Sequence, residues 1–190
     1  MQLLPPQQLH QLSVPVKIID ARPLEQWRKG HIPGALSFDW QSNTETDRQQ
    51  VPYRRLTNGV LAERLGRLGI NEHSRLVVYG DADSSWGGEG WVCWLLRELG
   101  HVGEIYLLDG GVQAWQKLHG DLTVADAVVA VPTTYRVVER CELDIKTEEL
   151  RQAELQLVDT RSLFEWLCGS IPGAVRISWT EFYRGEERRT

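Results

Sequence analysis

The sequence lacks any apolar run of the roughly 18 residues that a membrane-spanning helix requires. Its first 17 residues also lack the basic start, the continuous apolar stretch and the small-residue cleavage site of a secretory signal. These absences argue against an integral membrane protein and against a secreted one. The expected location is therefore the reducing cytoplasm.

Cysteine is scarce, with three residues, Cys93, Cys141 and Cys168. They form no CxxC pair and no cluster with histidine, so neither a disulfide framework nor a metal site is expected, and no cofactor is implied. Basic residues do not dominate either: 21 Lys and Arg against 26 Asp and Glu give a net charge of −5. Because nucleic-acid-binding proteins present a basic face, nucleic acid is not an expected partner.

What the sequence does contain is typical of a folded globular protein. Hydrophobic residues make up 42% and charged residues 25% of the chain. Eight tryptophans are present, and since tryptophan buries a large apolar surface, several of them are expected in the core or in the wall of a pocket. The 190 residues correspond to one large domain, or to one domain plus a remainder.

Short apolar runs alternate with helical patterns along the first 120 residues. The predicted strands are 16–20, 35–38, 75–79 and 104–108, and the predicted helices are 24–29, 61–68, 91–99 and 111–118. This alternation predicts an α/β fold with a mostly parallel sheet of about five strands, covered by helices on both faces. Residues 80–86, in a loop rich in small residues, are expected at the carboxyl edge of the sheet, where such folds bind ligands.

A repeat at an offset of 139 residues is the most informative feature. Residues 18–40 read IIDARPLEQWRKGHIPGALSFDW, and residues 157–179 read LVDTRSLFEWLCGSIPGAVRISW. The two segments share a D-x-R triplet, a tryptophan and an IPGA block at the same spacing, without a gap. Chance similarity does not preserve such a pattern, so the chain contains two copies of one α/β unit.

The second copy begins near residue 147 and supplies only an opening strand, a helix and the next strand. Two strands and one helix bury too little apolar surface to be stable alone. We therefore expect a complete domain at 1–120, a linker at 121–146 and a truncated second domain at 147–190. The apolar residues of the second copy are expected to be poorly ordered, to pack on the first domain, or to promote association of an otherwise monomeric protein.

These motifs resemble the rhodanese superfamily. The D-x-R-x4-W-x2-G-H-I-P-G-A segment is followed by a VVY strand, a small-residue loop, WLL-x2-LGH and LLDGGVQAW. The tandem arrangement is similar to the two-domain sulfurtransferases that act on thiosulfate or 3-mercaptopyruvate. The resemblance implies the rhodanese three-layer fold. It also implies transfer of sulfane sulfur, through a cysteine persulfide, from a small anionic donor to a thiol or to cyanide.

In that family, an active domain carries its nucleophilic cysteine directly after the third strand, at the start of a loop whose backbone amides cradle an anion. Here loop 81–86 reads DADSSW, so Asp81 stands at the nucleophile position. A carboxylate cannot form a persulfide. Asp81 and Asp83 also repel an anionic substrate, by about 4 kcal/mol per charge pair at 4 Å and an effective dielectric of 20. The first domain therefore resembles the non-catalytic N-terminal domain of tandem sulfurtransferases.

The repeat offset places the second-copy counterpart of Asp81 at position 220, outside the 190 residues. No residue present is therefore expected to be catalytic, and the chain as it stands is expected to be inactive. Two functions remain open. One is part of a tandem sulfurtransferase whose catalytic loop is absent, and the alternative is a non-catalytic rhodanese-like module for binding or regulation.

Arg161 is the best candidate to bind the anionic substrate, because the resemblance places the second-domain arginine of the motif near the active pocket. The alternative is that the D-x-R triplet positions the following turn through hydrogen bonds, which is the favoured role for Arg22. His31 has Ser170 as its counterpart, so a structural hydrogen bond is favoured over a general base. Cys93 lies in an apolar helix and is interpreted as a buried core thiol.

Overall fold

The computed structural model describes residues 1–12, 14–81, 85–125, 130–140, 143–145, 147–150, 155–184 and 187–188. Within them, a five-stranded sheet forms in the order β1-β7-β6-β2-β3, and every pairing between these strands is parallel. The strands are β1 (Gln2–Leu4), β2 (Lys17–Asp20), β3 (Leu36–Ser37), β6 (Leu76–Tyr79) and β7 (Ile105–Leu108). The predicted α/β fold with a mostly parallel, five-stranded sheet is confirmed.

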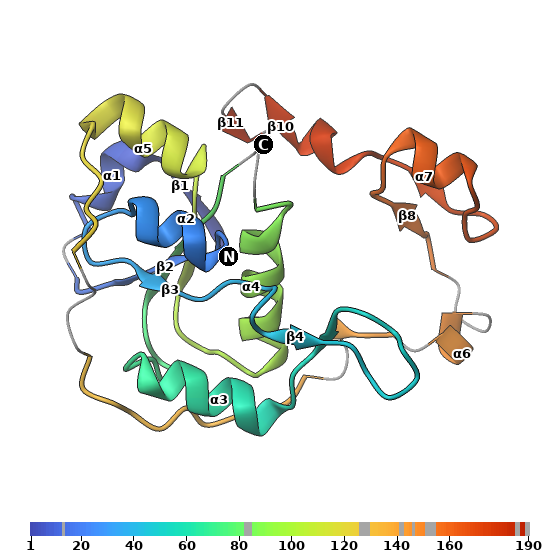
Figure 1. Cartoon of the computed structure of the whole chain (residues 1–190), viewed down its shortest axis with the longest axis horizontal. Coiled ribbons are helices and arrows are strands. Elements are labelled where there is room, and N and C mark those ends of the chain that lie inside the picture. The colour runs from blue at the N-terminus through green and yellow to red at the C-terminus, as the bar shows by residue number, and fades with distance from the viewer. Residues whose placement is uncertain are drawn as a thin grey trace.

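Helices cover both faces of this sheet (Figure 1). They are α1 (Pro6–Leu9), α2 (Leu24–Lys29), α3 (Asn58–Arg67), α4 (Gly88–Glu98) and α5 (Gly111–His119). In the central strand β6, Leu76 and Val78 pack in one buried cluster with α3 and α4. Val77 and Tyr79 pack in a second cluster with α1 and α5. Because successive side chains of a strand point to opposite faces of the sheet, β6 contributes to both apolar layers.

The edge strand β1 and the short helix α1 were not predicted from the sequence. β1 pairs with β7, with Gln2 opposite Tyr106 and Leu4 opposite Leu108. β1 has three residues, and Leu4 is the buried one. A strand this short gives no apolar pattern in the sequence. Its place is set by backbone pairing with β7, which periodicity does not reveal. A separate antiparallel pair is formed by β4 (Thr44–Glu45) and β5 (Arg54–Arg55).

Residues 130–140, which the sequence predicts as part of a linker, lie against the first unit, and we call them the strap. Tyr135 is 5% exposed and belongs to the buried cluster that contains α3 and α4. Its hydroxyl lies 3.1 Å from Nδ1 of the buried His101. The N–H of Val138 donates to the carbonyl oxygen of Leu99, at 3.0 Å. The strap therefore contributes side chains to the core of the first unit.

The second copy repeats the local structure of the first. Its elements are α6 (Thr147–Leu150), β8 (Val158–Asp159), α7 (Leu163–Leu167), β9 (Val175–Arg176), the 3-10 helix η2 (Trp179–Phe182), β10 (Tyr183–Arg184) and β11 (Glu187–Arg188). β8 pairs in parallel with β9, with Val158 opposite Val175. In the first copy β2 pairs with β3, with Ile19 opposite Leu36. Both positions shift by the offset of 139, so the strand register is repeated too.

Figure 1 shows β8 and α7 to one side of the five-stranded unit. Many large apolar side chains of this copy are exposed: Leu155, Val158, Leu163, Phe164, Leu167, Ile171, Val175, Trp179 and Phe182. The most exposed of them, Phe164, leaves 76% of its surface accessible to solvent. Each exposed large apolar side chain forgoes about 1.5–3 kcal/mol of burial.

Candidate functional site

The loop that follows β6 lies at the carboxyl edge of the sheet, where parallel α/β sheets bind ligands. β6 ends at Tyr79 and α4 begins at Gly88, so the loop leads into the N-terminus of α4. Gly87 adopts a left-handed conformation with φ of 76°, and Trp86 does so with φ of 48°. The side chain of Trp86 is 76% exposed. The described residues of the loop, 80–81 and 85–87, thus lie between the end of β6 and the start of α4, as predicted.

The interior of the loop is filled by its own side chains. Ser85 is fully buried, and its Oγ accepts a hydrogen bond from the N–H of Asp81 at 2.9 Å. The same Oγ lies 2.8 Å from Oε2 of Glu89 and also contacts the carbonyl oxygen of Asp81. A Cβ at Gly80 would lie 2.2 Å from Oε2 of Glu89 and 2.5 Å from Oγ of Ser85, so a side chain there would displace these two groups. Asp81, Ser85 and Glu89 thus form one packed cluster.

Two carboxylates occupy this end of α4. A helix N-terminus attracts negative charge through its free N–H groups and its dipole, and Glu89 supplies that charge from the first turn. Glu89 is 1% exposed and Asp81 is 8% exposed. Two acidic side chains are therefore buried beside this loop, and Asp81 also interacts electrostatically with Arg22. Asp83, the other acid expected here, lies outside the described residues.

Ser85 and Glu89 were missed as functional candidates by sequence reasoning. The available signal was their spacing of four residues, which places two side chains on one side of a starting helix. That spacing does not reveal that both side chains are buried. Their burial depends on Gly80, which lets the strand end approach the first turn of α4.

Arg22 forms hydrogen bonds with Asp20 at the end of β2 and with Gly30 after α2. Its Nε and Nη2 donate to the carboxylate of Asp20 over 2.6–3.1 Å, and Nη2 also donates to the carbonyl oxygen of Gly30 at 2.7 Å. The Tyr79 hydroxyl donates to Asp20 at 2.6 Å and accepts from the N–H of Ile32 at 3.1 Å. Burial opposes the charge of Arg22, but its hydrogen bonds to Asp20 raise its pKa. Burial, reinforced by Asp20, raises the pKa of Tyr79 and keeps its hydroxyl protonated.

Arg161 repeats this arrangement in the second copy. Its Nε and Nη2 donate to the carboxylate of Asp159 over 2.7–3.2 Å, and Nη2 donates to the carbonyl oxygen of Gly169 at 2.7 Å. These hydrogen bonds lower the pKa of Asp159 and raise the pKa of Arg161. Arg161 is 45% exposed, against 6% for Arg22, and it lines a cleft of about 1060 Å³ beside β8. This geometry agrees with both roles considered for Arg161.

Within the described residues, Cys93, Cys168 and His31 belong to no metal site. Cys93 is buried in α4 and Cys168 is exposed after α7, whereas Cys141 falls outside the described part of the chain. The described residues contain no group of three or more His, Cys, Asp or Glu that could hold a metal ion. His31 donates from Nδ1 to the carbonyl oxygen of Trp27 at 2.9 Å and stacks on its ring.

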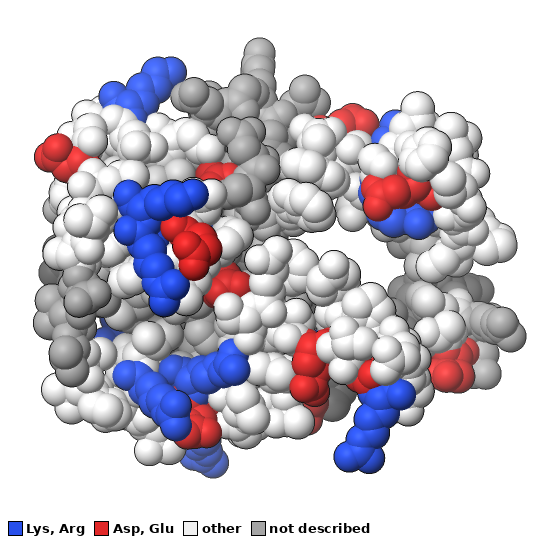
Figure 2. Space-filling model, viewed as in Figure 1, with Lys and Arg blue, Asp and Glu red and all other residues white. Residues whose placement is uncertain are grey.

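Charged side chains of both signs are interspersed on the face of the protein in Figure 2, and much of that face is uncharged. This face shows no continuous basic surface of the kind that binds nucleic acid. Among the helices that the structure describes, none has the length and apolar character needed to cross a membrane.

Comparison with known proteins identifies relatives. Residues 5–118 match the family of the rhodanese-like domain. Over 92% of its length, the chain is 26% identical to 3-mercaptopyruvate sulfurtransferase of Escherichia coli (strain K12), and over 88% it is 30% identical to 3-mercaptopyruvate sulfurtransferase of Homo sapiens. The crystal structure of SseA from Escherichia coli matches all of this chain with a TM-score of 0.86 and 25% identity.

These relatives are longer than the chain. The aligned region spans 69% of the E. coli protein, 60% of the human protein and 79% of the SseA crystal structure. The match therefore includes both copies of the repeat, but only part of each relative.

Proposed function

This chain belongs to the rhodanese family, and on that premise we propose that it forms the first unit and the opening of the second unit of a tandem sulfurtransferase. The substrates proposed are a small anionic sulfur donor, thiosulfate or 3-mercaptopyruvate, and a thiol or cyanide as acceptor. Three features support this proposal: the repeat, the names of the relatives, and a match to SseA that extends over both copies.

The reaction of this class requires a sulfur nucleophile. A cysteine thiolate attacks the sulfane sulfur of thiosulfate, the S–S bond breaks, and sulfite leaves with the bonding electrons. The resulting persulfide passes its outer sulfur to the acceptor, which regenerates the thiolate. The family resemblance places this nucleophile at the position of Asp81, so a unit that carries out this chemistry needs a thiol there.

The single observation that carries the assignment of the first unit as non-catalytic is Asp81 at that position. Its carboxylate offers no sulfur to form a persulfide. The cluster with Ser85 and Glu89 further fills the loop where the family resemblance implies an anion cradle. The first unit then serves as a scaffold, and a protein containing these 190 residues transfers sulfur only if a cysteine loop is supplied at the counterpart position in the second unit.

Arg161 is proposed to bind the anionic donor in an intact second unit. Its guanidinium is already oriented by Asp159 and Gly169, and it lines the cleft beside β8. A fixed guanidinium suits a sulfonate or carboxylate group because it donates two parallel hydrogen bonds. The reducing cytoplasm is the proposed location, because the three cysteines show no paired spacing in the sequence.

The test is a sulfurtransferase assay of the purified 190-residue chain, with thiosulfate and cyanide and then with 3-mercaptopyruvate. No turnover is expected, and the E. coli relative serves as the positive control for the assay. Turnover by this chain would overturn the assignment of Asp81. Should that occur, Cys93→Ser, Cys141→Ser and Cys168→Ser identify which thiol is responsible.

A second variant tests the filled loop. Asp81→Cys restores a thiol but leaves Glu89 buried beside it, so the thiolate is disfavoured and the donor is repelled. Little or no activity is expected, and thiosulfate is not expected to protect the new thiol from alkylation. A substantial rate in Asp81→Cys would show that the loop is a competent cradle that has lost only its nucleophile.

The alternative is a non-catalytic rhodanese-like module for binding or regulation. The observation that favours it is the exposed apolar surface of the second copy, which offers a contact for association of an otherwise monomeric chain. The DNA that follows the codon of Thr190 distinguishes the two functions. A reading frame that continues into a strand and a cysteine loop supports the sulfurtransferase, whereas an authentic stop codon there supports the module.

A further inference from the structure

A cleft of about 290 Å³ lies between α2 and α3, at the carboxyl end of the edge strand β3. Its lining comes from the start of α2, from the end of β3 with the turn that follows it, and from the last turn of α3. It includes Leu24, Ser37, Asp39, Arg64, Arg67 and Leu68, and every residue of the lining belongs to the described part of the chain. The cleft shares no residue with the loop that follows β6 or with the second copy, so it is separate from the proposed sulfurtransferase site.

A series of hydrogen bonds holds the turn that follows β3 against α3. The carboxylate of Asp39 accepts from the N–H of Ser42 at 2.8 Å and from its hydroxyl at 2.7 Å. Asn43 donates from Nδ2 to the carbonyl oxygen of Asp39 at 2.6 Å. Nη1 of Arg64 donates to the carbonyl oxygen of Ser42, and to Oδ1 of Asn43 at 3.0 Å. The guanidinium of Arg64 is therefore fixed in orientation without a ligand.

The repeat shows that the connection after β3 does not depend on this polar network. At the offset of 139, the three side chains that form it with Arg64 are replaced by Ser178, Glu181 and Phe182. β9 nevertheless leads into the hairpin β10–β11, as β3 leads into β4–β5. The network is therefore a feature of the first copy and not of the shared motif.

Arg64 brings a positive charge to the cleft that no acidic side chain of the described residues pairs directly. Its Nη1 has neutral acceptors, and its Nε and Nη2 remain as donors for a ligand. Arg67, the second cation of the lining, forms an ion pair with Glu63. Asp39, the acid of the lining, is 4% exposed and directs its carboxylate to Ser42. Arg64 is thus the group best placed to meet an anion that enters the cleft.

We propose that this cleft binds a small organic anion, a carboxylate or a monophosphate. Its volume lies just below the roughly 300–1,000 Å³ of sites for drug-sized ligands, so it suits a ligand with a single ring. The body of the ligand lies on Leu24 and Leu68, and its anionic group accepts two parallel hydrogen bonds from Nε and Nη2 of Arg64. Ser37 adds a hydroxyl to the lining as a further donor.

The experiment uses the full 190-residue chain and fluorine NMR titrations of three single-ring probes. 4-Fluorobenzoate carries a carboxylate, 4-fluorophenyl phosphate carries a phosphate, and 4-fluorobenzyl alcohol is the neutral control of similar size. At least one anion is expected to bind saturably and at least about tenfold more tightly than the alcohol, because charge-assisted hydrogen bonds are the stronger ones. The anion that binds more tightly identifies the charged group of the ligand. The absence of saturable binding by both anions overturns the proposal, and so does equal binding of the alcohol.

Charge is tested with Arg64→Gln, which keeps an amide N–H for the carbonyl oxygen of Ser42 but removes the guanidinium. The tighter anion is expected to bind at least about tenfold more weakly, whereas the affinity for the alcohol is expected to change by less than about twofold. The matched control is Arg75→Gln, which removes an exposed arginine directly before β6, at the opposite edge of the sheet. An unchanged affinity in Arg64→Gln overturns the proposal, and so does an equal loss in Arg75→Gln.

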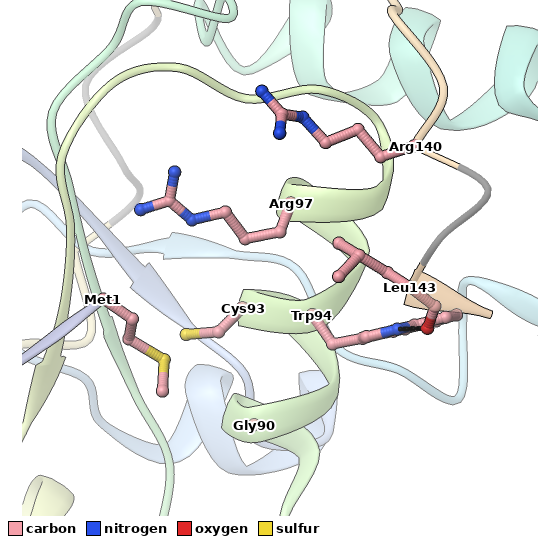
Figure 3. Close-up of a pocket in the computed structure, with 7 residues that line it drawn as sticks. All are labelled: Met1, Gly90, Cys93, Trp94, Arg97, Arg140 and Leu143. Carbon is pink, nitrogen blue, oxygen red and sulfur yellow. Dashed lines mark hydrogen bonds between the residues drawn. The ribbon is translucent and has the colours of Figure 1, made fainter. Parts of the chain in front are cut away.

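Location is tested with Ser37→Leu, which places a larger side chain in the cleft. Arg176 occupies the same strand register in the second copy, so this position of the motif accepts a large side chain. The matched control is Gly90→Leu, which fills a separate cavity along α4 (Figure 3), where a Cβ meets no atom within 4 Å.

The unfolding midpoints of both leucine variants are measured to establish that each is folded. Saturable binding of the anion is expected to be lost in Ser37→Leu and to be kept in Gly90→Leu. Binding that survives in folded Ser37→Leu, or that is lost in folded Gly90→Leu, places the probe elsewhere and overturns the proposal.

Discussion

The segment β2–α2–β3 and its repeat β8–α7–β9 have the same local structure in very different surroundings. Both contain the arginine–aspartate hydrogen bonds, and both bring a glycine into the left-handed region, with φ of 80° at Gly34 and 84° at Gly173. Ile32 is nevertheless 1% exposed, whereas its counterpart Ile171 is 52% exposed. The repeat motif therefore fixes the backbone through local hydrogen bonds, and burial comes from elements outside the motif.

The difference in burial between the two copies comes from the strands and helices that surround each of them. In the first copy, β6 pairs with β2, and Ile32 packs in a cluster with Val112 and Trp115 of α5. In the described part of the second copy, β8 pairs with β9 alone, and its sheet has two strands. Matched variants of the two copies measure how far the shared local structure is stabilised by these surroundings.

The largest effect is expected from removing the aspartate of each triplet. Asp20→Ala leaves the buried Arg22 without its partner, and breaking a buried pair in this way costs about 3–5 kcal/mol. Asp159→Ala removes the same hydrogen bonds at an exposed site and is expected to leave the unfolding midpoint of the first unit unchanged. Urea unfolding measures both variants, with Asp20→Asn as the milder substitution. Equal effects of the two alanine variants would contradict the comparison.

Ile32 and its counterpart Ile171 test how burial affects the contribution of an uncharged side chain to stability. Ile32→Ala creates a cavity in the core and is expected to lower the free energy of unfolding by about 2–5 kcal/mol. Ile171→Ala removes the same atoms from an exposed side chain, so its effect is expected to stay within about 0.5 kcal/mol. Thermal unfolding of both variants provides the measurement. A large loss in Ile171→Ala would mean that the second copy is packed in solution.

Acidification is expected to destabilise the first unit but not the second copy, and to lower the free energy of unfolding on the order of 1 kcal/mol. Burial lowers the pKa of His101, which stays neutral in the folded state with Nε2 bound to the carbonyl oxygen of Ser74. Below a pH of about 6.5, the unfolded chain binds a proton that the folded chain does not, so the free energy of unfolding falls as pH falls.

Urea unfolding at pH 7, 6 and 5 measures this decline, and His101→Gln is expected to reduce it. Residues 147–190 contain no histidine, so hydrogen exchange in that region is expected to show no opening that depends on pH in this range, after correction for the intrinsic exchange rate. A decline of the same size in His101→Gln would assign the pH dependence to other groups.

The smallest effect is expected from removing the second copy altogether. A chain that ends after Ile145 keeps the strap and the Trp94–Leu143 hydrogen bond, so its unfolding midpoint is expected to match that of the parent. Its solubility is expected to rise, because the exposed apolar surface is gone. A chain that ends after Gly120 also loses Tyr135 and serves as the contrasting control, with a midpoint lower by several degrees. A lower midpoint in the longer chain would show that the second copy stabilises the first.

Much of the candidate site was predictable, because it depends on local order along the chain. An apolar run followed by small residues and a helix places residues 80–86 at the carboxyl edge of a parallel sheet, and Asp81 near the start of this segment is read directly from the sequence. The burial of Ser85 and Glu89 was not predictable in this way. It depends on how closely Gly80 approaches α4, which is a property of packing.

The sequence by itself determined the repeat, the α/β alternation and the local geometry of both D-x-R turns, because these rest on periodicity and on hydrogen bonds between residues close in the chain. Only the tertiary structure decided that β1 completes the sheet, that Tyr135 enters the core, and that Ser37 and Arg64 line one cleft. Each of these depends on contacts between segments far apart in sequence. Such contacts are selected by the shape and burial of the whole fold, so no local pattern in the chain encodes them.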